Sequence, residues 1–244
     1  MDSLKDKKKN IGALFDNIAS HYDLLNHLLS FNIDKFWRKK AVKMLNNKKD
    51  NLLDVATGTC DLAIEIARQQ KANKIMGIDL SEQMLTIGKE KIAKANLSNL
   101  IDIKQEDCTD LSFADCSFDA ITCGFGVRNF SNLDKGLREM YRVLKPQSQI
   151  IIIEFSYPKN PIVKCLYDFY FSCILPFVGK IVSKDKKAYE YLPASVKHFI
   201  WGEEFVAHLK NAGFTNAKYK TMTLGVCTLY SAIKSKEEKI KTPF

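Results

Sequence analysis

The sequence predicts an α/β fold: a doubly wound, mostly parallel sheet with an antiparallel edge at its C-terminal side. Between residues 52 and 155, short β-prone runs alternate with helical patterns, which is typical of parallel strands joined by crossover helices. The last two β-prone runs, 214–221 and 225–233, are close enough to pair as a hairpin. A length of 244 residues suits one such domain with insertions.

The first strand–helix–strand unit, residues 52–79, carries the strongest sign of a ligand. A β-prone run leads through a turn at Gly58 into a helical pattern, and a second β-prone run ends at Asp79. Gly58 lets the backbone approach a ligand closely, and the first N–H groups of the helix point to the same place. The Asp79 carboxylate can accept hydrogen bonds from both hydroxyls of a ribose. The alternative is that Gly58 only turns the chain and Asp79 only caps the next helix.

The residues after Gly58 restrict the cofactor. A dinucleotide site needs the pattern G-x-G-x-x-G, but Cys60 and Ala63 stand at its second and third glycine positions. No Lys-Ser or Lys-Thr pair follows at the spacing of a phosphate-binding P-loop. A cofactor with a ribose and no phosphates remains, and S-adenosylmethionine fits this description.

Two further strand ends complete the expected cofactor site. The strand at 101–105 is followed by Asp107 and Cys108, where a carboxylate can bind the adenine amino group and a backbone N–H can bind a ring nitrogen. The alternative is that this carboxylate is a solvated loop acid. The strand at 118–123 is followed by Gly124, and small residues there leave space for a reacting group beside the sulfonium.

The rest of the chain is expected to cover the sheet. The remaining elements are, in chain order, a helix capped by Ser81, a helix at 133–144 ended by Pro146, a buried strand at 149–155 and a helix at 202–212. We expect a single domain over 11–234 with a helical insertion at 159–200. Residues 1–10 are expected to be a disordered basic tail, and residues 235–244 a polar tail.

The N-terminal region, 11–48, is expected to form a helical lid over the cofactor. It places His21, Tyr22 and Asp23 side by side ahead of the first strand, an unusual density of polar groups for such a segment. Trp37 recurs with other apolar residues at helical spacing, so we expect it in the core.

The composition limits the cellular context and the partners. Seven cysteines without a C-x-x-C pair and four histidines without a paired motif predict no metal site and a reducing cytoplasm. The N-terminus lacks the apolar stretch of a secretory signal, and charged residues interrupt the apolar run 162–182. The net charge of +9 suits an anionic partner, either nucleic acid or the inner membrane surface, although lysines on solvated faces explain most such excesses.

Several short segments together resemble the two signatures of the menaquinone and ubiquinone biosynthesis C-methyltransferases. The likeness runs from Phe15 to Ile233, and its segments are 22–26 (Tyr-Asp-Leu-Leu-Asn), Ser30, 37–38 (Trp-Arg), 124–129 (Gly-Phe-Gly-Val-Arg-Asn), 142–146 (Arg-Val-Leu-Lys-Pro), 154–156 (Glu-Phe-Ser) and 189–193 (Tyr-Glu-Tyr-Leu-Pro). The resemblance implies a class I S-adenosylmethionine-dependent fold and methylation of a ring carbon of a polyprenylated quinol. The cofactor contacts that it implies are Thr59, Asp79, Asp107 and Cys108.

The chain departs from this family at positions that usually hold glycine. Asn32, Cys60 and the pair 147–148 (Gln-Ser) stand there instead. Asparagine accepts a positive φ, and cysteine is small enough to be tolerated. The pair at 147–148 is expected in a turn remote from the chemistry.

Methyl transfer to a ring carbon needs an electron-rich ring held in line with the sulfonium. Forming the quinol phenolate at neutral pH costs about 4 kcal/mol, because a phenol titrates at roughly pH 10. We expect Arg128 to stabilise this anion and Asn129 to orient the second quinol oxygen. The proton acceptor is expected among His21, Asp23 and a bound water, with His21 favoured. An ion pair between Arg128 and a helix acid such as Glu139 is the structural alternative.

Tyr22, Phe125 and Tyr191 are expected to contact the substrate, whereas Cys123 is expected in the core rather than as a nucleophile. Overall likeness favours demethylmenaquinol, a naphthoquinol, over a benzoquinol. The main rival is an RNA methyltransferase, but the Asn/Asp-Pro-Pro-aromatic segment that amino-directed base methylation uses does not follow the fourth strand. A non-catalytic cofactor-binding module is the second rival.

The aromatic stretch 162–178 and its flanking lysines are expected either to contact anionic lipid or to pack as an insertion. The sequence therefore predicts a cytoplasmic enzyme with a peripheral contact at the inner membrane face. A homodimer stays open.

Overall fold

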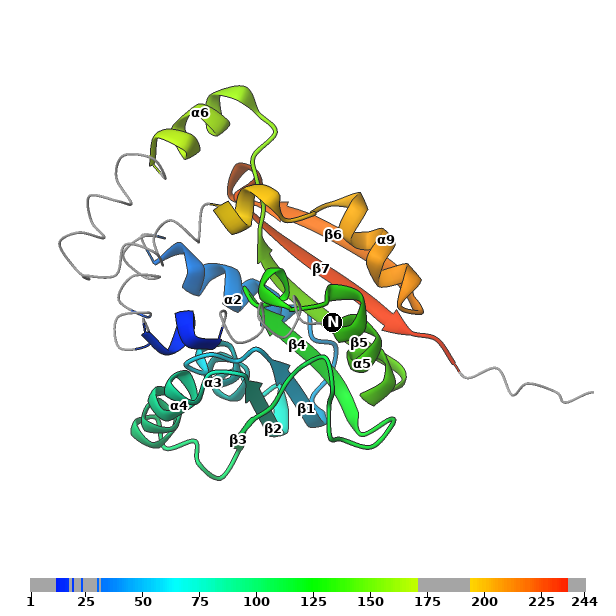
Figure 1. Ribbon diagram of the computed structural model, residues 1–244. Coiled ribbons are helices and arrows are strands. Elements are labelled where there is room, and N and C mark those ends of the chain that lie inside the picture. The colour runs from blue at the N-terminus through cyan, green and yellow to red at the C-terminus, as the bar shows by residue number, and fades with distance from the viewer. Residues whose placement is uncertain are drawn as a thin grey trace, which may run out of the picture.

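The computed structural model describes residues 12–17, 19, 23, 30, 32–170 and 194–236. Within them, seven strands form one sheet in the order β3-β2-β1-β4-β5-β7-β6 (Figure 1). The strands are β1 (Lys49–Val55), β2 (Ala72–Asp79), β3 (Ile101–Gln105), β4 (Phe118–Gly124), β5 (Leu144–Phe155), β6 (Phe214–Met222) and β7 (Cys227–Lys234). β1 to β5 are parallel, whereas β7 runs antiparallel to β5 and to β6. The predicted doubly wound sheet with an antiparallel C-terminal edge is confirmed.

Helices cover both faces of the sheet (Figure 1). They are α2 (Ile33–Lys43), α3 (Asp61–Arg68), α4 (Glu82–Lys94), α5 (Leu133–Val143), α6 (Pro161–Phe169) and α9 (Glu203–Asn211), with the 3-10 helices η1 (Val127–Asn129) and η3 (Thr223–Gly225). Ser81 caps α4 as predicted, because its Oγ accepts a hydrogen bond from the backbone N–H of Met84 at 3.1 Å. No described helix combines the length and the apolar character that crossing a bilayer requires.

The strand order reverses between β1 and β4, and this reversal determines where a ligand can bind. β1 pairs with β2 on one side and with β4 on the other, so that Leu52 lies between Ile75 and Ala120. The connections from β1 and β4 therefore leave in opposite directions and open a crevice at the carboxyl ends of these strands. Open α/β sheets bind their ligands in such crevices.

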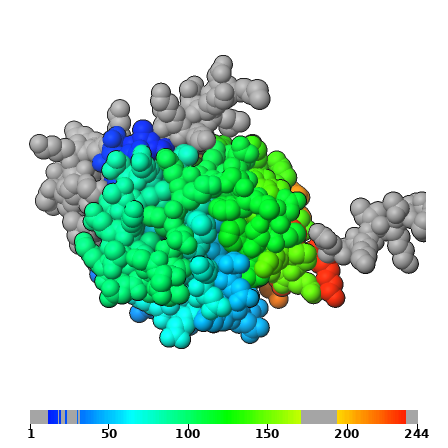
Figure 2. All heavy atoms as spheres, turned by 90° about the horizontal axis from the view of Figure 1, so that it is seen from below, coloured from blue at the N-terminus to red at the C-terminus, as the bar shows by residue number. Residues whose placement is uncertain are grey.

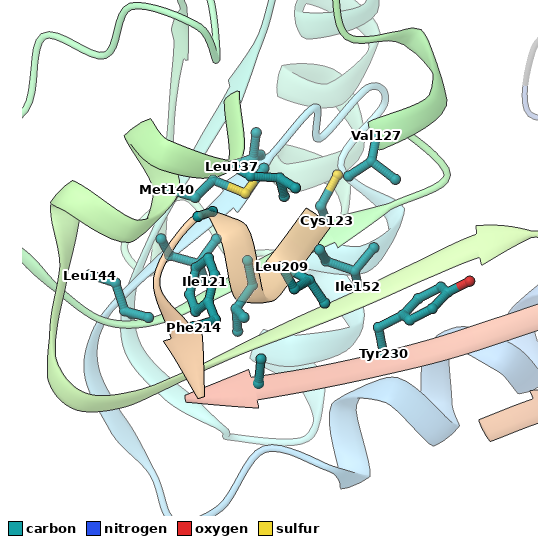
Figure 3. Close-up of a cluster of buried hydrophobic side chains, with 14 of the residues drawn as sticks. Ile121, Cys123, Val127, Leu137, Met140, Leu144, Ile152, Leu209, Phe214 and Tyr230 are labelled. Carbon is teal, nitrogen blue, oxygen red and sulfur yellow. The ribbon is translucent and has the colours of Figure 1, made fainter. Parts of the chain in front are cut away.

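The core consists of two apolar clusters, one on each face of the sheet. β5 contributes to both, because Ile150 and Ile152 face one cluster while Ile151 and Ile153 face the other. Figure 3 shows part of the first cluster, in which side chains of the strands pack against helices α5 and α9. The second cluster packs α2 and α3 on the opposite face, and Trp37, only 2% exposed, belongs to it as predicted.

β5 begins earlier than the sequence predicts. Leu144 was expected to end a helix, but its backbone is extended and it pairs with Phe118 of β4. The turn expected at 147–148 is also wrong, since both residues lie within β5. Gln147 nevertheless has a φ of 61°, and the pairing of β4 with β5 shifts its register beside it. A strand that absorbs an irregularity through a left-handed residue is a bulge-like arrangement.

Three residues that replace a usual glycine do adopt left-handed conformations. The φ angles of Asn32, Cys60 and Gln147 are 59°, 66° and 61°. The expectation for Asn32 is confirmed. At Cys60, which precedes α3, the side chain packs so closely on α4 that a Cβ placed at Gly88 would lie 2.6 Å from the Cys60 Sγ. Cys60 is thus tolerated together with the absence of a side chain at Gly88.

We predict that Gln147→Gly raises the free energy of unfolding by about 0.5–1 kcal/mol. A left-handed conformation costs an L-residue roughly 1–2 kcal/mol, and the extra entropy of an unfolded glycine offsets part of the gain. Urea unfolding measures the change. Lys74→Gly is the matched control, because Lys74 is an exposed strand residue without a positive φ, and this change should destabilise. Equal destabilisation by both substitutions would contradict the prediction.

Candidate active site

A cavity of about 90 Å³, partly open to solvent, lies at the carboxyl ends of β1, β2 and β4. Seven of the residues expected at a site line it: Gly58, Asp79, Asp107, Cys108, Gly124, Phe125 and Asn129. Gly12 and Phe15, from the expected lid, also line it. The sequence-based placement of a site at these strand ends therefore agrees with the geometry. His21, Tyr22 and Tyr191 lie outside the described residues.

Asp79 connects the turn after β1 to the start of α4. Its Oδ2 accepts a hydrogen bond from the backbone N–H of Gly58 at 2.8 Å, and its Oδ1 accepts one from the backbone N–H of Ser81 at 2.9 Å. Burial raises the pKa of the Asp79 carboxyl, against the lowering by these backbone donors. An ionised carboxylate offers about four lone-pair sites, so Asp79 can accept further hydrogen bonds from a ligand in the cavity.

Asp54, a residue that sequence reasoning missed, supports the turn that contains Gly58. It is fully buried and accepts hydrogen bonds from Thr57 Oγ1 at 2.6 Å and Thr122 Oγ1 at 2.5 Å, which ties the turn after β1 to β4. Burial raises the pKa of Asp54 to about 6. A carboxylate within the apolar run Leu-Leu-Asp-Val was the available signal, since buried acids are rare unless they have partners.

The residues expected to bind adenine, after β3, also line the cavity. Asp107 Oδ1 accepts a hydrogen bond from the backbone N–H of Thr109 at 2.9 Å and so shapes the turn after β3. Asp107 and Cys108 both line the cavity, and so does Glu106, whose carboxylate lies 2.9 Å from the Lys104 ammonium. This wall offers a carboxylate and adjacent backbone groups to a ligand that presents both donors and acceptors.

A polar network joins Asp23 to the turn between β1 and α3. Thr59 Oγ1 donates a hydrogen bond to Asp23 Oδ1 at 2.5 Å, and Lys91 Nζ lies 2.5 Å from Asp23 Oδ2 and 3.1 Å from Thr59 Oγ1. Lys91 also contacts Asp61 at the start of α3. Two predicted site residues, Asp23 and Thr59, are thus brought together, although neither lines the cavity. Sequence reasoning missed Lys91, because its partners are distant in the chain.

Arg128 forms a buried ion pair. Its Nη1 lies 2.6 Å from Glu154 Oε1 and donates to the Phe125 carbonyl at 2.6 Å, while its guanidinium lies 5.3 Å from the Phe155 ring centre. The two charged side chains are only 4% and 1% exposed. Arg128 therefore does form an ion pair, as the structural alternative held. Its partner is Glu154, whereas the expected partner, Glu139, pairs with Arg142. Whether Arg128 also stabilises an anion stays a prediction.

Phe125 lines the cavity and packs against other aromatic rings behind it. The Phe125 ring lies 4.6 Å from the Phe155 ring and 6.1 Å from that of Trp37, centre to centre. Gly126 follows, and a Cβ there would lie 2.5 Å from that of Ala56, so only glycine allows this approach. Phe125 itself has a φ of 60°, which is rare for a bulky residue and is often found at functional sites.

Cys123, the cysteine considered as a nucleophile, is fully buried in β4. Burial raises the pKa of the Cys123 thiol well above its ordinary value, which supports the interpretation as a core residue and disfavours a nucleophile. In the part of the chain that the structure describes, no three His, Cys, Asp or Glu side chains are grouped as metal ligands.

Known proteins resemble this chain over nearly its whole length. Residues 1–234 match the ubiE/COQ5 methyltransferase family. A demethylmenaquinone methyltransferase of Porphyromonas gingivalis is 45% identical over 230 residues, 93% of this chain and 94% of that protein. One of Bacteroides fragilis is 44% identical over 229 residues, with the same two shares. A ubiquinone/menaquinone biosynthesis C-methyltransferase of Geotalea daltonii is 44% identical over 236 residues, 96% of this chain and all of that protein.

Solved structures share the fold. The [4+2]-cyclase SpnF superposes with a TM-score of 0.70 at 17% identity, covering 93% of this chain and 97% of that one. A SAM-dependent methyltransferase of Thermotoga maritima, a possible histamine N-methyltransferase, gives a TM-score of 0.64 at 16% identity, covering 92% and 100%. At these identities the likeness shows the fold alone.

We predict that Asp54 makes the protein less stable as the pH rises. Because burial raises the pKa of Asp54 from 3.8 to about 6, the folded state holds the proton more tightly, and this stabilisation is lost between pH 4 and about 6. Between pH 5 and 7.5, the parent should lose about 1 kcal/mol of unfolding free energy relative to Asp54→Asn, measured by urea unfolding. Asp102→Asn, at an exposed strand position, controls for removal of a carboxylate. Parallel pH profiles of parent and Asp54→Asn would contradict the prediction.

Proposed function

The chain belongs to the ubiE/COQ5 methyltransferase family, and from this premise we propose that it methylates a ring carbon of demethylmenaquinol to give menaquinol. It is an S-adenosylmethionine-dependent C-methyltransferase of quinone biosynthesis. The relatives from Bacteroides fragilis and Porphyromonas gingivalis are named demethylmenaquinone methyltransferases, which favours the naphthoquinol ring. The Geotalea daltonii relative is named for both quinones, so a benzoquinol is the alternative substrate.

One observation carries the cofactor assignment: the residues expected to bind the ribose and the adenine line a single cavity at the point where the strand order reverses. In our proposal Asp79 binds the ribose hydroxyls, and Asp107 and Cys108 bind the adenine. Gly58 and Gly124 leave space for the cofactor backbone and its sulfonium. The residues fit the group, because the Asp79 carboxylate lines the cavity with acceptor capacity beyond its two backbone donors, and the segment 124–126 that lines it is Gly-Phe-Gly. When bound, S-adenosylmethionine supplies an electrophilic methyl group.

The quinol ring would lie on the aromatic side of the cavity. Phe125 lines this side and is held by the neighbouring Phe155 and Trp37 rings, so it can present a rigid apolar face to the substrate. Asn129 also lines the cavity, and its amide can hold a quinol oxygen. Tyr22 and Tyr191 stay predicted substrate contacts. A fixed ring held in line with the methyl group supplies much of the rate enhancement, because alignment is most of the task.

We propose a narrower role for Arg128 than the sequence suggested. Glu154 neutralises much of its charge, so the guanidinium stabilises a phenolate less than an unpaired one would. Its hydrogen bond to the Phe125 carbonyl holds the left-handed turn that carries the aromatic wall. Arg128 then acts chiefly by positioning Phe125, with its residual charge as a smaller contribution.

We also propose that His21 accepts the proton and that Asp23 anchors the lid. Both Asp23 oxygens are engaged, one by Thr59 and the other by Lys91, so proton uptake there would disrupt these contacts. An imidazole titrates at roughly pH 6.5, which suits a base at neutral pH. The cytoplasmic location, the peripheral membrane contact and the homodimer considered from the sequence stay predictions, and they belong to this proposal.

The function is tested by offering prenylated naphthoquinol and benzoquinol with methyl-labelled S-adenosylmethionine. We expect the label on the naphthoquinol ring. Label on the benzoquinol alone would overturn the choice of ring, and label on neither would overturn the function.

Asp79→Asn should weaken cofactor binding by about tenfold or more in calorimetry, because charge-assisted hydrogen bonds of about 1.5–3 kcal/mol are lost. Glu90→Gln, on an exposed face of α4, should leave cofactor binding unchanged.

The roles of His21 and Asp23 can be separated by kinetics. His21→Ala should lower kcat by about a hundredfold with unchanged cofactor affinity. Asp23→Asn and Lys91→Met should instead share a raised KM for the cofactor, since either change breaks the same anchor. Lys94→Met is the matched control, because Lys94 is 79% exposed and its ion pair with Glu90, at 3.8 Å, is a weak surface pair. A kcat loss with Asp23→Asn but not with Lys91→Met would make Asp23 the base.

A further inference from the structure

Five large apolar side chains are exposed on three segments near one edge of the sheet. On α6, Ile162, Leu166 and Phe169 are 72%, 64% and 58% exposed, and their spacing of four and three residues puts them on one helix face. Leu224 of η3 is 77% exposed, and Phe36 of α2 is 50% exposed. Single exposed apolar residues are ordinary, but a group of this kind indicates an interaction surface.

α2 contacts η3 directly, and η3 contacts the chain that leads from β5 to α6. Trp37 of α2 donates a hydrogen bond from Nε1 to Thr223 Oγ1 of η3 at 2.8 Å. Ser156, which leads from β5 toward α6, donates to the Gly225 carbonyl of η3 at 2.8 Å. A Cβ at Gly225 would lie 3.5 Å from Pro158, so η3 also packs against this connection. α2, η3 and α6 therefore surround the point where β5 ends and β7 begins.

Contacts on one side of α6 hold the helix so that its apolar side is exposed. Tyr167 is 8% exposed and packs edge-on against Tyr157, with ring centres 5.6 Å apart. Tyr157 in turn donates to both carboxylate oxygens of Asp168, at 2.7 and 2.8 Å. These contacts hold one side of α6 against the chain leaving β5. Figure 1 shows α6 and the β6–β7 turn at one end of the molecule, whereas Figure 2, seen from below, shows mainly residues of β1 to β5 and their helices.

Lysines lie on or next to the same helices. Lys40 lies over the Phe36 ring at 5.3 Å, Lys164 over the Tyr157 ring at 5.3 Å, and Lys159 over the Trp201 ring at 4.9 Å. The two acids on the same helices are engaged, Asp168 by Tyr157 and Asp34 by Arg38. Apolar side chains bordered by lysines and aromatic rings are typical of proteins that lie at the surface of an anionic bilayer.

We propose that Phe36, Ile162, Leu166, Phe169 and Leu224, with Lys40, Lys159 and Lys164, form a docking face that rests on an anionic lipid bilayer. This rests on the proposed function, because a polyprenylated quinol carries its tail in the bilayer and its ring must be drawn from there. The docking face adjoins the aromatic wall of the cavity, since Phe155, 4.6 Å from Phe125, immediately precedes Ser156. A second copy of the chain fits less well, because a two-fold interface would set these lysines against each other.

Vesicle flotation tests the docking face. The parent should float with vesicles of phosphatidylcholine and phosphatidylglycerol, and far less with phosphatidylcholine alone. Leu166→Asn and Leu224→Asn, on separate segments, should each lower the bound fraction several-fold, and the pair Lys159→Glu with Lys164→Glu should remove the preference for anionic lipid. Tyr219→Ser is the control, because Tyr219 is a partly exposed aromatic residue on β6 outside the face. Failure of the parent to bind anionic vesicles would overturn the proposal.

Activity on two substrates separates this proposal from the proposed function. With a quinol that lacks the long tail and dissolves in water, the Leu166→Asn and Leu224→Asn variants should turn over as the parent does. With the long-tailed quinol in anionic vesicles, their activity should fall with their binding. Loss on the water-soluble quinol in folded variants would instead show a role inside the enzyme. A dimer that these substitutions dissociate, with vesicle binding unchanged, would make the face an interface between copies; either result overturns lipid docking.

Discussion

The hydrogen bonds that the Asp79 carboxylate accepts from Gly58 and Ser81 hold the candidate site together. They join the turn after β1 to the start of α4, so the two walls of the cavity keep a fixed separation. Burying a carboxylate without such donors would cost several kcal/mol, and burial raises its pKa even with them. Behind the turn, burial also raises the pKa of Asp54, and the charge of Asp79 raises it further. Acidic side chains, those of Asp79, Glu106 and Asp107, line the cavity, and this disfavours a phosphate-bearing cofactor.

Charged groups near the cavity are held in ion pairs and hydrogen-bond networks. Arg128 is committed to Glu154, and Lys91 connects Asp23, Thr59 and Asp61. Removing one member of a buried pair leaves its partner uncompensated, which costs more than the pair contributes. The charges near the cavity thus act mainly by fixing backbone and aromatic groups in position. Our proposal therefore assigns proton removal from the quinol to His21 and not to Asp23.

The sequence predicts the fold well because β1, β2, β4 and β5 each contain a buried apolar run that local patterns are enough to find. The strand ends that carry Gly58, Asp79, Asp107 and Gly124 could be read in the same way, since parallel strands bring their carboxyl ends to one edge. Contacts between distant segments were not readable: Lys91 meets Asp23 across 68 residues, and Glu154 meets Arg128 across 26. The early start of β5 was missed because Pro146 suggests a stop, while pairing with β4 extends the chain through it.

The close packing of Cys60 on Gly88 makes the two positions epistatic. While sulfur occupies this space, any larger residue at position 88 collides with it, although alanine would otherwise favour a helix by about 1 kcal/mol. With glycine at position 60, the sulfur is gone and position 88 can accept alanine, whose Cβ would then lie 3.4 Å from the Thr59 backbone. The order of substitutions then matters: a mutational path through position 60 is open, whereas the path that changes position 88 first passes through a destabilised intermediate.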